Sequence, residues 1–135
     1  MYDSTELKYG DRFFLIYIKM KAKFAFYDNN LDEIESIINI YAEKFVDIDP
    51  VIEYVKVLGY ILLEDHKSVI DNIVVLIPKL KARNNIVELE YYLAISYIAY
   101  EQLEDAKAVL EFVGWKDYNL KYVEMCKELA TNTFE

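Results

Sequence analysis

The sequence predicts an all-α protein of about seven antiparallel helices, and three observations support this fold class. Only three glycines and two prolines occur in 135 residues, too few for the tight turns of a many-stranded β protein. Apolar residues recur every three or four positions, which is the period of an amphipathic helix. Short polar clusters separate the apolar segments, and such short connections make neighbouring helices antiparallel. The length is typical of one domain, so we expect a single domain over residues 1–135.

The predicted helices cover residues 10–28, 31–46, 50–64, 67–82, 86–101, 103–113 and 117–131. The first ends at the polar cluster formed by residues 28–30. The second carries an apolar face with acidic residues between its apolar positions. Before the third, the carboxylate of Asp49 is placed to cap a helix that starts with Pro50.

The fourth predicted helix contains the β-branched segment 69–77, which by itself also fits a buried strand. Asp71, Asn72 and Lys79 frame this segment and favour a helix, with Pro78 as a kink or close to the end. Asn84 and Asn85 form the turn before the fifth helix. A left-handed glycine at position 114 is expected to end the sixth helix, and the seventh follows it.

The chain aligns with itself at a period of 36 residues. Four columns of the second helix in each pair are apolar throughout: Ile34, Ile70 and Ala106; Ile37, Ile73 and Val109; Ile38, Val74 and Leu110; Tyr41, Ile77 and Val113. The turn column, by contrast, is polar: Asn29, Asp65 and Glu101. We therefore expect three helical hairpins followed by one further helix.

The third repeat, residues 87–113, carries the clearest pattern. Small and large apolar residues alternate in its two helices: Leu93, Ala94 and Tyr97, then Leu103, Ala106 and Leu110. This pattern resembles the tetratricopeptide repeat family, whereas the first two repeats match it less well, since Ile34 and Ile70 replace the small residue of the second helix. The resemblance implies a right-handed superhelical array of hairpins, capped by the seventh helix.

Chemically reactive side chains are scarce. The single histidine, His66, falls in a polar turn and is expected to be a solvated loop residue, and the single cysteine, Cys126, is expected to be a small buried apolar residue. Residues 28–39 only partly match a calcium-binding loop, because Glu33 stands where glycine is needed. No glycine-rich phosphate loop is present. We therefore expect no enzyme activity, no cofactor and no metal site.

The net charge and its distribution along the chain indicate which kinds of partner the protein can bind. The formal net charge of -9 disfavours direct binding to nucleic acid. The acidic residues concentrate in 28–55 and 84–135, whereas residues 1–27 are mildly basic. The absence of a long apolar run, of a signal sequence and of paired cysteines favours a cytoplasmic protein without membrane insertion.

The resemblance also implies a concave groove lined by the first helices of the hairpins. Carried over through the 36-residue period, the groove positions are Lys19, Lys23, Phe26, Tyr27, Val55, Leu62, Leu63, Tyr91, Ile95 and Ile98. Some family members hold a terminal carboxylate with a basic clamp, but Glu88 and Tyr92 stand where the third repeat needs basic groups. The groove is therefore expected to be mainly apolar, with Lys19 and Lys23 meeting acidic groups.

These observations predict a non-enzymatic protein-interaction module, an adaptor or chaperone-like protein, that binds a peptide or amphipathic segment in the groove. The occupant can be another protein, a second copy of the chain or the chain's own N-terminal residues. Other hypotheses remain open: the sensor half of a peptide-responsive regulator, a structural homodimer, and a small helical enzyme or ligand-binding domain.

Overall fold

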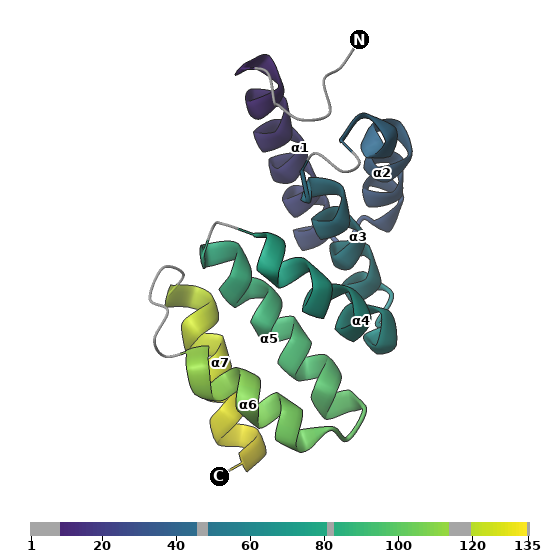
Figure 1. The fold of residues 1–135 in the computed structure, drawn as a ribbon. Coiled ribbons are helices and arrows are strands. Elements are labelled where there is room, and N and C mark those ends of the chain that lie inside the picture. Colours follow the sequence, from purple (N-terminus) through teal and green to yellow (C-terminus); the bar gives the residue numbers. More distant parts are fainter. Residues whose placement is uncertain (1–8, 46–48, 81–82, 114–119, 135) are drawn as a thin grey trace. The chain divides into compact units, whose positions relative to one another are not determined.

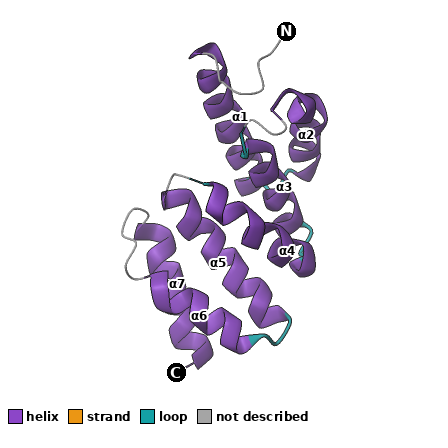
Figure 2. Cartoon of the chain, viewed as in Figure 1, coloured by secondary structure: helices purple, strands orange, loops and turns teal. Residues whose placement is uncertain are grey.

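The computed structural model of the protein describes residues 9–45, 49–80, 83–113 and 120–134 (Figure 1). These residues form seven α-helices, one short 3₁₀-helix and no strand (Figure 2), which confirms the all-α prediction. The elements are α1 (Tyr9–Tyr27), α2 (Leu31–Phe45), α3 (Val51–Leu62), α4 (His66–Leu76), η1 (Ile77–Lys79), α5 (Arg83–Ala99), α6 (Leu103–Val113) and α7 (Leu120–Phe134).

The chain divides into two compact units, residues 1–65 and residues 66–135. In the first unit, α3 packs against both α1 and α2, which also contact each other. In the second unit, α5 packs against α4, α6 and α7, and α6 also contacts α7. The expectation of a single domain and that of a right-handed superhelix stay predictions.

Two helix starts follow from local capping, of which the cap by Asp49 was predicted. The backbone N–H of Glu33 donates to Oδ1 of Asn30 at 3.1 Å, which caps α2. The backbone N–H of Val51 donates to Oδ1 of Asp49 at 2.9 Å, and Pro50 stands between them. These bonds satisfy N–H groups that have no partner inside the helix, so the polar residues before each helix fix where it begins.

The fourth helix is shorter than predicted. It ends at Leu76, and the chain continues through the 3₁₀ turn of η1 before Leu80 becomes extended. Pro78 explains this end, because proline lacks an N–H group and its ring clashes with the carbonyl four residues earlier. Segment 69–77 is thus helical through Leu76, not a strand.

The fifth helix begins three residues before the predicted start. Asn85 was expected in a turn, but it lies inside α5 and is 3% exposed. Burial in the folded structure therefore outweighs the local turn preference of asparagine. The helix end expected at Gly114 falls outside the described residues.

The ends of α1, α3 and α5 share one backbone geometry. Asn29, Glu64 and Glu101 each have a positive φ, between 55° and 60°. Each donates its N–H to the carbonyl three residues earlier, at 3.0–3.1 Å, and the next residue donates to the carbonyl five residues earlier. These bonds are typical of a left-handed helix end.

The three turns also give the register of the repeats. The spacing from Asn29 to Glu64 is 35 residues, and that from Glu64 to Glu101 is 37, whereas we predicted 36 for both. In the middle turn, Glu64 and not Asp65 therefore corresponds to Asn29. Counted from the turns, the positions of α3 lie one residue earlier than the sequence register placed them.

Candidate functional site

The first helix is apolar on two opposite faces. Its inner face is buried and consists of Leu15, Ile18, Ala22, Ala25 and Phe26. Its outer face exposes a second set, here called the α1 stripe, which consists of Phe13, Ile16, Tyr17, Met20, Phe24 and Tyr27. The stripe residues are spaced by one, three or four positions, and at 3.6 residues per turn they form one band along the helix.

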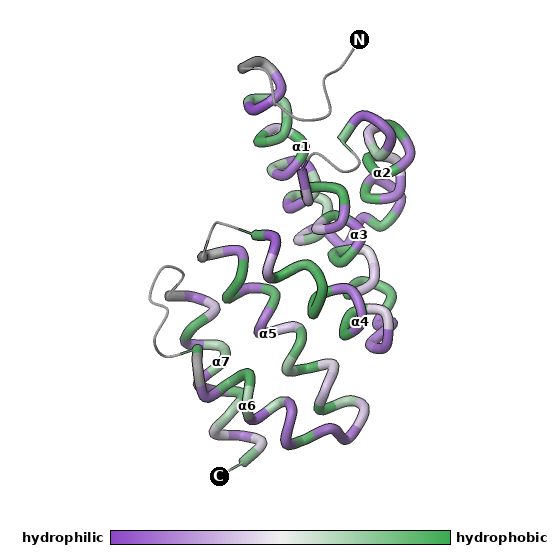
Figure 3. Tube along the Cα trace, viewed as in Figure 1, coloured by the Kyte–Doolittle hydropathy of each residue, from purple (hydrophilic) through white to green (hydrophobic). Residues whose placement is uncertain are grey.

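The side chains of the stripe are large and apolar, and yet they are strongly exposed to solvent. The exposed fractions of its six side chains run from 50% for Tyr17 and Tyr27 to 66% for Phe24. Figure 3 shows hydrophobic residues recurring along the length of α1, with hydrophilic positions between them. Half-exposed side chains of this size leave on the order of 500 Å² of apolar surface in one band. A patch of that size is often functional.

Basic residues border the stripe on the side of α3. The ammonium groups of Lys19 and Lys23 lie 5.3 Å and 5.9 Å from the centroid of the Tyr54 ring. Tyr54 belongs to α3 and its side chain is fully buried. An ammonium group at this distance from an aromatic ring is attracted to it, so these contacts hold both lysines beside the stripe.

Two ion pairs join α1 to α2. Lys21 Nζ lies 3.1 Å from Oε1 of Glu33, and Lys44 Nζ lies 3.7 Å from Oδ1 of Asp11. The hydrogen bond to Glu33, and then the charge of that carboxylate, raise the pKa of Lys21. Each pair thus joins a charge on α1 to an opposite charge on α2, and Asp11 shares the helical face of the buried residues Leu15 and Ile18.

Seven of the predicted groove residues belong to the first unit. Lys19, Lys23 and Tyr27 lie on or beside the α1 stripe, whereas Phe26 is on the buried face with its ring 5.6 Å from that of Tyr27. On the third helix, Val55 is fully buried, Leu62 is half-buried and Leu63, just after the helix, is exposed. Because of the one-residue shift found at the turns, Ile61 and not Leu62 corresponds to Phe26.

The other three predicted groove residues, Tyr91, Ile95 and Ile98, lie on α5 in the second unit and are half-buried. The ring of Tyr91 contacts that of Tyr92 at 5.1 Å and that of Tyr122, on α7, at 5.9 Å. Tyr91 also packs against the buried cluster of this unit, which includes Cys126. Contacts with α7 thus cover part of the surface that Tyr91 was expected to offer.

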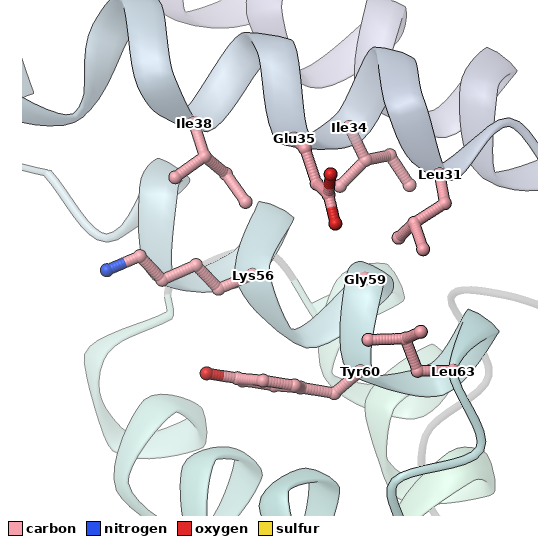
Figure 4. A pocket seen from close by; sticks show the side chains of 8 residues that line it. All are labelled: Leu31, Ile34, Glu35, Ile38, Lys56, Gly59, Tyr60 and Leu63. Atoms are coloured by element: carbon pink, nitrogen blue, oxygen red, sulfur yellow. The ribbon is translucent and has the colours of Figure 1, made fainter.

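A pocket of about 240 Å³ lies between α2 and α3 (Figure 4). Residues spaced by three and four positions line it from the α2 side and the α3 side: Leu31, Ile34, Glu35 and Ile38, then Lys56, Gly59, Tyr60 and Leu63. Figure 4 shows the Glu35 carboxylate pointing toward Gly59, while Lys56 extends its amino group away from Glu35. The pocket is smaller than the roughly 300–1,000 Å³ of small-molecule sites.

The two reactive side chains singled out in the sequence have structural contacts. His66 is the first residue of α4, not a solvated loop residue, and its Nδ1 lies 3.0 Å from the Ser96 hydroxyl on α5. Cys126 is buried, as predicted. Within the described ranges, no group of three or more His, Cys, Asp or Glu residues is placed to hold a metal ion. No helix in those ranges combines the length and apolar content needed to cross a membrane.

Sequence reasoning missed most of the α1 stripe. Phe13, Tyr17, Met20 and Phe24 were not among the predicted groove residues, although their spacing shows in the sequence as a second apolar band on the first helix. The α2–α3 pocket was missed as well, because it depends on how closely two helices approach each other.

Comparisons with known proteins identify no family for the chain, since no family model, no curated protein and no solved structure matches it.

Proposed function

We propose that the protein is a non-enzymatic, cytoplasmic interaction module that binds an amphipathic segment of another protein along the α1 stripe. The observation that carries this proposal is the exposed apolar band on a helix whose opposite face is already buried. A helix that only stabilises its own unit needs one apolar face. The stripe does not pack against the other helices of the unit in this way. Covering it with a partner removes apolar surface from water.

The proposal keeps the tetratricopeptide-like architecture as its framework. The shared left-handed ends of α1, α3 and α5 support a repeated design, since each first helix stops through the same set of bonds. Lys19 and Lys23, held beside the stripe by the Tyr54 ring, are the basic groups that meet acidic groups of the segment. The contacts of His66 and the burial of Cys126 give both residues structural roles, which supports a non-enzymatic function.

The test is the recovery of bound proteins from the source cells by a variant in which three stripe residues, Phe13, Met20 and Phe24, are replaced by serine. Covering half of a large apolar side chain contributes on the order of 1 kcal/mol, so the triple variant should lose about 3 kcal/mol, or about a hundredfold in affinity.

The matched control replaces Ile40, Val74 and Val75 by serine, since these residues are apolar and similarly exposed but lie on α2 and α4. Wild type and control should recover the same partner, and the stripe variant should not. Equal recovery by all three proteins would overturn the assignment. Light scattering at two concentrations tests the homodimer: a stable dimer that the stripe variant abolishes would replace the proposal.

A further inference from the structure

We infer that the pocket between α2 and α3 is a docking site for one tryptophan side chain of a partner protein. The pocket is separate from the α1 stripe, because none of its lining residues belongs to α1. The inference therefore goes beyond the proposed function and does not depend on it. It follows from the size of the pocket, from the polar groups that line it, and from a comparison with other occupants.

The size of the pocket matches one large side chain. Its volume of about 240 Å³ lies below the range of small-molecule sites. A cavity of about 150 Å³ is enough for benzene, so this pocket has room for the two fused rings of an indole. Its lining runs from Leu31 to Ile38 and from Lys56 to Leu63, a length of about 10 Å along each helix at 1.5 Å per residue. The pocket is thus elongated, as an indole is.

The wall of the pocket is mainly apolar, and its depth depends on a glycine. Aliphatic side chains form most of the wall: Leu31, Ile34, Ile38 and Leu63. Gly59 has no side chain, and a Cβ at this position would already lie 3.4 Å from Cγ2 of Ile34. A long side chain at position 59 would therefore occupy the space between the helices. Large aromatic side chains that fill such apolar pockets supply much of the binding energy of protein interfaces.

One group in the wall is a hydrogen-bond acceptor. The carboxylate of Glu35 points toward Gly59, across the pocket (Figure 4). This carboxylate makes no hydrogen bond or ion pair with another described residue. A carboxylate accepts hydrogen bonds, and an indole is an apolar group with a single N–H donor that usually finds an acceptor when it is buried. Tryptophan therefore fits the pocket better than phenylalanine or leucine, whose side chains have no donor.

Two further groups supply donors that fit a peptide backbone. Lys56 is exposed and Tyr60 is half-buried, and both line the pocket. In Figure 4, the Lys56 amino group and the Tyr60 hydroxyl point toward the same end of the pocket. Ammonium and phenol groups donate hydrogen bonds, so they match the carbonyl oxygens on either side of a tryptophan residue. Free indole has no such oxygens, which favours a tryptophan that belongs to a polypeptide.

Two other occupants fit less well. An arginine side chain would pair with Glu35, but Lys56 lines the same pocket and repels a second positive charge. A second copy of the chain has only one tryptophan to offer, Trp115, which lies outside the described residues. Each copy also carries a net charge of -9, and like charges disfavour association.

The test is a titration of the ¹⁵N-labelled full chain, followed by NMR, with the N-acetylated amides of tryptophan, 1-methyltryptophan, phenylalanine and arginine. The tryptophan probe should shift the amide signals of Leu31, Gly59 and Leu63, with a dissociation constant on the order of 1 mM for a single side chain. The 1-methyltryptophan and phenylalanine probes should bind at least about fivefold more weakly, because neither donates a hydrogen bond to Glu35.

Two substitutions of Glu35 test the hydrogen bond. Glu35→Gln keeps an acceptor oxygen and should keep the preference for tryptophan over 1-methyltryptophan. Glu35→Leu removes the acceptor and should bind both probes equally. The response of an arginine occupant is different, because the loss of charge in Glu35→Gln already weakens it. Circular dichroism checks that each variant is folded.

A third substitution fills the pocket. Gly59→Leu should abolish the shifts at Leu31 and Leu63, whereas Ser36→Leu, at an exposed position of α2 outside the lining, should leave them unchanged. If Gly59→Leu does not fold, Leu63→Ser carries the test, because Leu63 is exposed and its loss leaves the core intact. Leu63→Ser should weaken tryptophan binding at least about threefold, and Leu103→Ser, at an exposed position of α6, should not.

Several results would overturn the inference: equal binding of the tryptophan and phenylalanine probes, tighter binding of the arginine probe, shifts confined to α1, or unchanged binding in a folded Gly59→Leu variant. Tighter binding of free indole than of the tryptophan probe would make the occupant a small molecule. A dimer in light scattering that Gly59→Leu abolishes would make it a second copy of the chain. The serine variant of the stripe should bind the tryptophan probe as wild type does, so failure of one proposal leaves the other intact.

Discussion

Gly59 on α3 faces Ile34 on α2 at contact distance: a Cβ added to Gly59 would lie 3.4 Å from Cγ2 of Ile34. The next nearest atom, Cδ1 of Leu31, would lie at 3.8 Å. Both distances are ordinary van der Waals contacts, so α2 and α3 have room for a methyl group between them. The missing side chain also leaves the α2–α3 pocket open.

We therefore expect Gly59→Ala to stabilise the protein. Alanine is favoured over glycine inside a helix by about 0.5–1 kcal/mol, and the added methyl group fits against Ile34. Urea unfolding of the full chain measures the change in the free energy of unfolding. Ser36→Ala, at an exposed position of α2, controls for a general benefit of alanine. A loss of stability in Gly59→Ala would mean that the helices lie closer than the structure shows.

The left-handed turn after α5 supplies a second prediction. Glu101 has φ of 60°, a conformation that costs a residue with a side chain roughly 1–2 kcal/mol and that glycine adopts freely. Glu101→Gly should therefore raise the free energy of unfolding, whereas Glu124→Gly, inside α7, should lower it by about 1 kcal/mol. Thermal unfolding of both variants tests this difference in sign, and the same sign in both would refute the turn geometry.

The contact between His66 and Ser96 links α4 to α5. Ser96 is 2% exposed, and its hydroxyl lies 3.0 Å from Nδ1 of His66. Because a hydrogen bond of this kind contributes about 0.5–1.5 kcal/mol, Ser96→Ala should lower the free energy of unfolding by about 1 kcal/mol. A double-mutant cycle with His66→Ala separates the bond from other losses. A coupling energy near zero would show that the two side chains do not interact.

The pKa of Tyr91 is raised, first by burial of its hydroxyl and then by the nearby Cys126 and Glu128. The pKa of Tyr97 is raised as well, by burial and by Asp105. A raised pKa means that the folded state favours the neutral phenol. The stability from each group is therefore complete below the unfolded pKa of about 10 and is lost as pH rises through the folded pKa.

The Tyr91→Phe variant has no ionisable hydroxyl at this position. Its free energy of unfolding should therefore fall less than that of wild type between about pH 9 and pH 11. Urea unfolding at several pH values in this range gives the slope. Tyr100→Phe, which removes an exposed hydroxyl at the end of α5, is the control. If wild type and Tyr91→Phe lose stability in parallel, the Tyr91 hydroxyl does not carry the pH dependence.

Local signals predicted the helix boundaries well where one side chain acts on its own backbone. Asn30 and Asp49 cap helices from two or three residues away, and Pro78 ends α4 by its ring alone. These effects need no partner from elsewhere in the fold. Asn85 was misplaced because its burial inside α5 depends on the packing of that helix, which its neighbours in the sequence do not show.

The repeat register was predicted to within one residue. Apolar columns have a broad tolerance, since a helix face about 100° wide accepts neighbouring positions, and so the period of 36 aligned them well. A residue with positive φ marks each turn at a single position, and these residues are 35 and 37 positions apart. This difference moves the counterpart of Phe26 from Leu62 to Ile61, and with it the interpretation of the α3 surface.

The sequence by itself determined that the chain is helical, where most of its helices begin and end, and that its first helix has apolar residues on two sides. Only the tertiary structure decided which of the two sides is buried in the core of the first unit. Leu15, Ile18 and Ala22 face α2 and α3, while Phe13, Met20 and Phe24 remain exposed. Both bands repeat every three or four residues, and periodicity measures only the spacing within a band. The choice between them depends on which band fits the surface that two other helices form.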